Sequence, residues 1–152
     1  MSYSPNKGFF KPINKEKYKG DSSNIVYRSF LELKLMTRFD NDPNVIWWGS
    51  ETVVIPYKSP KDNKIHRYFI DFIANIKTIE NKTKTVIIEI KPKKQTSPPK
   101  KPTTKKLSNR YISEIMTWGV NSSKWKAAQE FAKDRGYEFI IMTEEDLGVS
   151  YK

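Results

Sequence analysis

Two apolar segments separated by a short polar stretch restrict the fold of this chain more than any other feature of its sequence. Residues 66–76 read as a strand with largely apolar side chains on both faces, and residues 85–91 form a second run rich in β-branched side chains. Residues 80–83, Glu-Asn-Lys-Thr, suit a turn between them. Because such strands must be covered on both faces, we expect a long hairpin inside a sheet that is flanked by helices.

The rest of the chain supplies candidate helices and further strands. The run 25–39 has no Gly or Pro and repeats apolar side chains at helical spacing, so it predicts a helix capped by one of three residues, Asp21, Ser22 or Ser23. Segments 45–48, 51–57 and 137–143 read as strands, segments 109–118 and 122–135 as helices, and 144–147 as a short helical turn. Ser122 or Ser123 would cap the helix at 122–135, which Gly136 ends.

This order predicts an α/β fold in which helices flank a small mixed sheet. Residues 1–20 are polar and turn-rich, and we expect an irregular N-terminal arm with Phe9, Phe10 and Tyr18 as candidate contacts to the body. Residues 21–152 would form a single domain. Within it, 92–107 is a basic insert rich in Pro and Lys, which we interpret as a low-complexity linker.

Charge and missing residue types narrow the function. The formal net charge is +11 and the basic residues are spread along the chain, which favours a nucleic acid as partner over an anionic membrane. With no cysteine and one histidine, any catalysis should use carboxylates, lysines and hard cations. No apolar signal segment precedes residue 20, so we expect an intracellular protein. The candidate phosphate contacts are Lys93, Lys94, Lys100, Lys101, Lys105, Lys106, Lys124 and Lys126.

Three residues of the hairpin carry the pattern that predicts chemistry. Glu89 and Lys91 are two residues apart on a strand, so both side chains leave the same face. Asp71 is embedded in an apolar strand, where an uncompensated charge is costly. A turn near residue 80 would make Asp71 and Glu89 near cross-strand partners, and their repulsion would be relieved by a cation such as magnesium. The competing interpretation is an ion pair of Asp71 with Arg67 or Lys91.

A fourth acidic residue lies on the first predicted helix. Glu32 stands in the mostly apolar stretch 30–35, on the helix that should cover the sheet. It could hold the water shell of the cation or a second cation. By contrast, we interpret His66 as a surface residue at a strand end, and the four tryptophans as packing residues.

The strings YRSFLELKL, YFIDFI and VIIEIKP, within residues 27–92, resemble the PD-(D/E)xK nuclease superfamily and most of all its TnsA-type endonuclease branch. The resemblance implies a restriction-endonuclease-like α-β-β-β-α-β core and a magnesium-dependent endodeoxyribonuclease, with manganese able to substitute and no small-molecule cofactor. It assigns Asp71 and Glu89 as metal ligands, together with the backbone carbonyl of Ile90. Lys91 would position the attacking water and Glu32 would act through water. The chain departs from the family pattern at Ile70, where the family has a proline before the aspartate.

The whole sequence is also similar to the family of head-completion nucleases of T4-like bacteriophages. That similarity implies processing of packaged double-stranded DNA when heads join tails, in the infected host cell or in the virion, with phage head or neck proteins as partners. Two alternatives stay open. The chain could be a non-catalytic basic DNA-binding protein of the virion neck, or a transposon-end endonuclease subunit.

Overall fold

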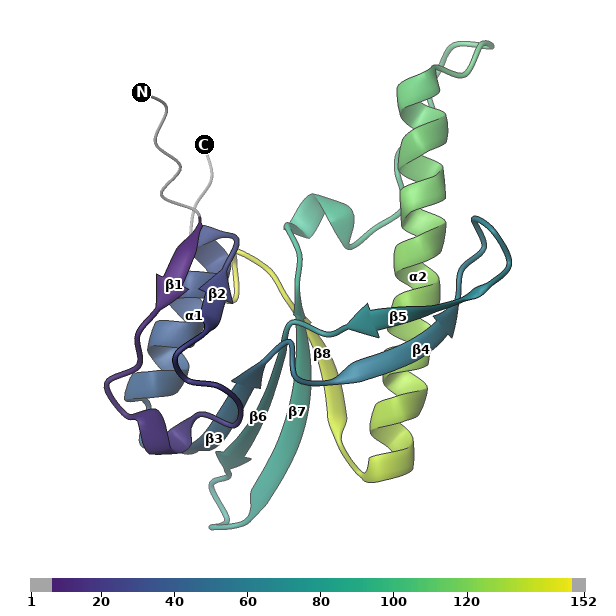
Figure 1. Cartoon of the computed structure of the whole chain (residues 1–152). Helices are drawn as coiled ribbons and strands as arrows, with labels where there is room; N and C mark the ends of the chain where they lie inside the picture. The colour runs from purple at the N-terminus through teal and green to yellow at the C-terminus, as the bar shows by residue number, and fades with distance from the viewer. Residues whose placement is uncertain (1–6, 149–152) are drawn as a thin grey trace, which may run out of the picture.

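The computed structural model describes residues 7–148 and centres on a four-stranded mixed sheet (Figure 1). Its strands are β3 (Val45–Ser50), β6 (Phe72–Lys77), β7 (Thr83–Ile90) and β8 (Glu138–Met142), in the order β3-β6-β7-β8. β3, β6 and β7 are antiparallel neighbours, whereas β8 lies parallel to β7. The predicted hairpin is therefore β6–β7, which is central in the sheet.

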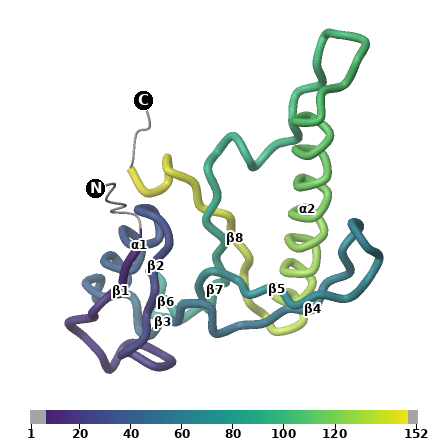
Figure 2. The backbone as a smooth tube through the Cα atoms, turned by 45° about the horizontal axis from the view of Figure 1, so that its top comes forward, coloured from purple at the N-terminus to yellow at the C-terminus, as the bar shows by residue number. Residues whose placement is uncertain are grey.

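A helix covers each face of this sheet, as the doubly apolar strands predict. On one face, α1 (Phe30–Asn41) shares a core with alternate residues of the hairpin, such as Phe72 and Ile88. On the other, α2 (Asn109–Arg135) packs against the residues between them, such as Ile73 and Ile87. Figures 1 and 2 agree that α1 and α2 lie on opposite sides. The order α1, β3, β6, β7, α2, β8 is the predicted α-β-β-β-α-β core.

A second hairpin is inserted between β3 and β6. β4 (Val54–Lys58) and β5 (Ile65–Phe69) pair only with each other, and the hairpin lies beside α2 (Figure 1). The prediction of one continuous strand over 66–76 is thus wrong, because the chain leaves one sheet and enters another at Ile70 and Asp71. The alternating pattern hides this change, since apolar side chains continue through it into two different sheets.

The beginning of the first helix also differs from the prediction over 25–39. α1 begins at Phe30, and its N-cap is Ser29, whose hydroxyl accepts a hydrogen bond from the Glu32 N–H at 3.1 Å. Residues Ile25–Tyr27 instead form strand β2, which pairs with β1 (Gly8–Phe10). Apolar spacing could not reveal this, because the strand depends on a partner from the N-terminal segment.

The N-terminal segment is not irregular over its described part, residues 7–20. Besides β1 it contains a short 3₁₀ turn, η1 (Lys15–Lys17). The ring of Tyr18 packs on Trp48 with centroids 4.7 Å apart, whereas Phe9 is exposed. The buried carboxylate of Asp40 on α1 accepts hydrogen bonds from two N–H groups of the segment, at 2.8 and 3.0 Å. These contacts attach the segment to α1 and β3.

The two helices predicted at 109–118 and 122–135 are one continuous helix. α2 starts after the N-cap Ser108, so Ser122 and Ser123 lie inside the helix and cap nothing. It ends as predicted at Gly136, whose φ of 70° is left-handed. Gly119 lowers the intrinsic helix propensity without breaking the helix, at a cost of about 1 kcal/mol that packing along α2 offsets.

The insert 92–107 contains one 3₁₀ turn, η2 (Lys93–Gln95), and otherwise no regular structure. The insert is held near the C-terminal part of the described chain by an ion pair between the Lys93 ammonium and Glu145, at 2.9 Å.

Of the helices within residues 7–148, none combines the length and the hydrophobicity needed to cross a membrane.

Candidate active site

Asp71 lies at the point where the chain passes from β5 to β6. Its backbone carbonyl accepts a hydrogen bond from the Glu51 N–H at 3.0 Å. Its carboxylate accepts one from the N–H of Ile90, on β7, at 2.8 Å. Phe72 pairs with Ile88, so Asp71 comes next to Glu89 in the hairpin register, as predicted. The side chain is therefore fixed against the end of β7.

Glu89 is the most buried charged group of the predicted set, with 5% of its surface exposed. Its Oε2 accepts a hydrogen bond from the Tyr68 hydroxyl at 2.7 Å and a longer one from Trp125 Nε1 at 3.4 Å. Tyr68 comes from β5 and Trp125 from α2, so two elements that are not part of the central hairpin fix the position of this carboxylate. Neither hydrogen bond was predicted from the sequence.

The carboxyl groups of Asp71 and Glu89 are close together and buried, so the charge of Glu89 changes the pKa of Asp71. Burial is the main cause that raises the pKa of Asp71, and the neighbouring Glu89 raises it further. Burial and Glu89 also raise the pKa of Tyr68, which therefore stays a neutral hydrogen-bond donor. The repulsion that the register predicts is thus present, and a cation between the two groups would relieve it.

Lys91 follows directly after β7, and its N–H donates to the Met142 carbonyl at 3.0 Å. The residue is half-buried, and no carboxylate of residues 7–148 lies within ion-pair distance of its ammonium. The alternative of an Asp71 ion pair is not observed in that range either, since the Arg67 guanidinium lies over the ring of Phe69. Asp71 therefore forms no ion pair with a cationic side chain of the described residues.

Glu32 has a local structural role that the sequence pattern did not indicate. Its carboxylate accepts a hydrogen bond from the Arg28 N–H at 3.0 Å, while the Ser29 hydroxyl accepts from the Glu32 N–H. Ser29 caps α1 as in a capping box, but Glu32 reaches one residue further back, to the N–H that precedes the N-cap. Burial raises the pKa of Glu32, and its charge contributes to the raised pKa of Asp71. Glu32 is therefore both a cap and a neighbour of the carboxylate pair.

The chain is similar in sequence to known nucleases. Residues 42–144 match the family model for the N-terminal domain of TnsA-like endonucleases. The chain belongs to this family. It is also 45% identical over 149 residues to the head completion nuclease of Enterobacteria phage T4, covering 97% of this chain and 95% of that relative. The predicted restriction-endonuclease-like fold is confirmed, and the chain is a nuclease.

The family match covers Asp71, Glu89 and Lys91 and begins after Glu32. No group of three or more acidic or histidine side chains that could hold a metal occurs in the described part of this nuclease. Two carboxylates remain, and the carbonyl of Ile90 belongs to the same strand end as the N–H that contacts Asp71. These oxygens are the ligands that hard divalent cations prefer, and magnesium needs only one or two carboxylates besides water and phosphate.

Two further residues next to the carboxylates were not among the sequence-based candidates. Arg28 forms an ion pair with Glu51, and the charges of Glu32 and Asp71 also raise the pKa of its guanidinium. Glu51 adopts a left-handed φ of 55° where the chain turns between β3 and β4. The sequence shows that Arg28 precedes the N-cap of α1, but it does not predict that this arginine lies near Asp71, because that depends on the fold.

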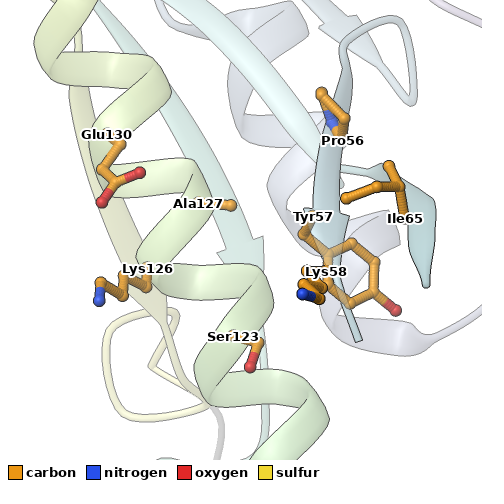
Figure 3. Close-up of a pocket in the computed structure, with 8 residues that line it drawn as sticks. All are labelled: Pro56, Tyr57, Lys58, Ile65, Ser123, Lys126, Ala127 and Glu130. Carbon is orange, nitrogen blue, oxygen red and sulfur yellow. The ribbon is translucent and has the colours of Figure 1, made fainter. Parts of the chain in front are cut away.

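The predicted phosphate contacts of this nuclease lie in different surroundings. Lys124 lies over the rings of Tyr57 and Tyr68, 5.7 and 5.5 Å from their centroids, and so stands next to a hydrogen-bond donor of Glu89. Lys126 lines a pocket of about 460 Å³ between the second hairpin and α2, with its amino group directed away from the hairpin (Figure 3). Lys93 is engaged with Glu145. The remaining predicted contacts, Lys94, Lys100, Lys101, Lys105 and Lys106, are exposed on the insert.

His66 is exposed on the second hairpin and hydrogen-bonds Asp62 at 2.7 Å, which fits its interpretation as a surface residue. Trp48 and Trp125 are buried, as expected for packing residues.

Proposed function

We propose that this nuclease hydrolyses phosphodiester bonds of double-stranded DNA with a magnesium ion held by Asp71 and Glu89. The observation that carries the proposal is the pairing of these two buried carboxyl groups next to the Ile90 backbone, with no cationic side chain of residues 7–148 within ion-pair distance of either. A bound divalent cation supplies positive charge at the scissile phosphate and makes water more acidic. Manganese, which prefers the same oxygen ligands, would substitute for magnesium.

Each predicted residue then has a separate task. Asp71 and Glu89 bind the cation from two rigid positions, because Ile90 holds one carboxylate while Tyr68 and Trp125 hold the other. Lys91 would orient the attacking water and offset the negative charge on the oxygens of the reacting phosphate. Glu32 is half-buried beside them and would contact the water shell of the cation.

We also propose that the DNA it cuts is packaged phage DNA during head completion. The support is the similarity over nearly the whole chain to a protein named head completion nuclease. Its site of action would be the infected cell or the virion, and its protein partners would be components of the phage head or neck. The net charge of +11 supports binding to DNA through its phosphates.

Plasmid cleavage tests the first proposal. Purified protein is incubated with supercoiled plasmid and magnesium, manganese or a chelator. Asp71→Asn and Lys91→Ala should reduce cleavage at least about a hundredfold, and Glu32→Gln less, because the glutamine oxygen can still accept the hydrogen bond from the Arg28 N–H. Asp62→Asn, on the exposed hairpin, is the matched control and should cut normally. Undiminished cleavage by both Asp71→Asn and Lys91→Ala would end this assignment, and intact plasmid with every metal would favour a DNA-binding structural protein.

A further inference from the structure

A second pocket, away from the carboxylates, lies between α2 and the insert. Its volume is about 590 Å³, within the range of roughly 300–1,000 Å³ that is usual for small-molecule sites. The insert reaches it directly after Lys91, passing through η2 and then along the N-terminal half of α2 (Figure 1). The predicted metal site and this pocket are therefore joined by one short stretch of chain.

The floor of the pocket contains a polar group that the protein leaves unused. Asn121 lines the pocket with only 7% of its surface exposed. Its side-chain amide makes no hydrogen bond to any other residue between positions 7 and 148. Asn121 is not among the residues with a fully buried, unpaired side-chain nitrogen or oxygen, so its amide atoms stay open to the pocket, where they offer two donors and one acceptor. This is the pattern that reads the edge of a nucleobase.

The remaining walls suit the other parts of a nucleotide. Trp118 lines the pocket and presents an aromatic surface on which a base can stack. Lys94, Lys100 and Arg110 supply positive charge, while the single acid of the pocket, Glu114, is engaged with Arg110 at 3.0 Å. The pocket thus combines an aromatic ring, a base-reading amide and excess positive charge for a phosphate.

Trp118 also connects the pocket to the carboxylates. Its ring meets that of Trp125 edge-on, with centroids 5.7 Å apart, and Trp125 Nε1 donates to Glu89. A nucleotide stacked on Trp118 would therefore be linked to Glu89 through two tryptophan side chains. Bases inside a duplex are paired and stacked, so only an unpaired nucleotide can enter such a pocket.

We propose that this pocket binds an unpaired nucleotide of the DNA substrate, so that the nuclease prefers DNA with a single-stranded extension beside the cut. The proposal rests on the proposed function in that DNA is the substrate, and it adds the structural class of that DNA.

Binding of two labelled duplexes tests it. One is blunt and the other carries a single-stranded extension with 2-aminopurine. Affinity is measured by fluorescence anisotropy with a chelator present, so no cleavage occurs. The extended duplex should bind about tenfold more tightly, as expected for one stacked base, and the 2-aminopurine emission should fall on binding. Asn121→Ala and Trp118→Leu should remove this preference and leave the affinity for the blunt duplex unchanged.

Controls separate this outcome from a general loss of binding or folding. Lys126→Ala, which lines the other pocket, should leave the ratio of the two affinities unchanged. Asn121→Asp keeps the size of the side chain but removes its donors, so it should lose the preference even if the alanine variant is unstable. Equal affinity of the wild type for both duplexes, or a preference that survives both Asn121 substitutions, would overturn the proposal. Plasmid cleavage is measured separately, so a failure here leaves the nuclease assignment intact.

Discussion

At the scale of single residues, the buried pair Asp71 and Glu89 stores unfavourable energy in the protein without a cation. Two carboxyl groups that share a dry site resist ionisation together, and Asp71 holds its proton more strongly in the folded chain than in the unfolded one. Functional sites commonly keep such costly groups, because the same arrangement binds what the reaction needs.

Replacing this acid should therefore stabilise the protein. The raised pKa of Asp71 means that its contribution to stability is greatest at low pH and falls as the pH rises above the ordinary pKa of an aspartate, about 3.9. Asp71→Asn is neutral at every pH, and its amide oxygen can still accept from the Ile90 N–H. We expect it to raise the free energy of unfolding by on the order of 2 kcal/mol at pH 7, with little change at pH 4. Urea unfolding across pH with a chelator measures this, and a wild-type advantage that grows with pH would contradict it.

Tyr68 should tune the affinity of the site for its cation. Tyr68→Phe keeps the ring but removes the 2.7 Å hydrogen bond that fixes Glu89. We expect the magnesium concentration for half-maximal cleavage to rise about tenfold, with a smaller change in the rate at saturation, because the carboxylate remains but is less well oriented. Tyr57→Phe, the other tyrosine beneath Lys124, is the matched control. An unchanged magnesium requirement would show that Tyr68 only packs.

At the scale of elements, α2 connects three parts of the molecule. Its C-terminal half packs on the sheet and the second hairpin, and Trp125 in its middle reaches Glu89. Its N-terminal half borders the insert and the second pocket. A continuous helix is needed to place these contacts in a fixed relation, which two separate helices would not do.

Gly119 offers a direct measurement of this continuity. A Cβ added there would meet the Pro60 ring at 3.7 Å, an ordinary van der Waals distance. Gly119→Ala should therefore raise the free energy of unfolding by roughly 0.5–1 kcal/mol, since alanine restricts the unfolded chain and favours helix. Thermal unfolding measures it. Gly136→Ala is the informative contrast and should destabilise, because φ there is 70°. A destabilising Gly119→Ala would indicate a helix that must bend or open at this point.

At the scale of the whole molecule, a strongly basic chain surrounds a small acidic centre. The net charge of +11 favours association with DNA phosphates, whereas Asp71 and Glu89 form the small acidic centre that we propose to hold a cation. Binding and cutting should consequently depend on different residues, and binding should persist without a divalent cation.

The basic insert should contribute to the salt dependence of binding. Replacing Lys100, Lys101, Lys105 and Lys106 by serine should make the fall of log affinity with log salt shallower, by about one unit for each lysine that contacts a phosphate. Titrations of a blunt duplex at several salt concentrations measure the slope. Lys84→Ser, which removes a lysine paired with Glu138, should leave the slope unchanged. An unaltered slope in the fourfold variant would identify the insert as a linker only.

The central hairpin, its turn and the neighbouring positions of Asp71 and Glu89 could be predicted from the amino-acid pattern alone. These features depend on alternation and turn chemistry within about 25 residues, where the chain has few other ways to bury its apolar side chains. The order of elements in the core followed from the same local patterns, and so did the end of α2 at Gly136.

The groups that complete the site depend instead on contacts between segments that are distant in the sequence. Tyr68 and Trp125 reach Glu89 from positions 21 and 36 residues away, and a tyrosine or tryptophan in an apolar segment gives no sign of which carboxylate it will meet. The same reason explains β2, which exists because β1 pairs with it, and the division of the predicted strand at Asp71 between two sheets. Local spacing specifies which face a side chain uses, whereas the partner on that face is chosen by packing between segments far apart in the chain.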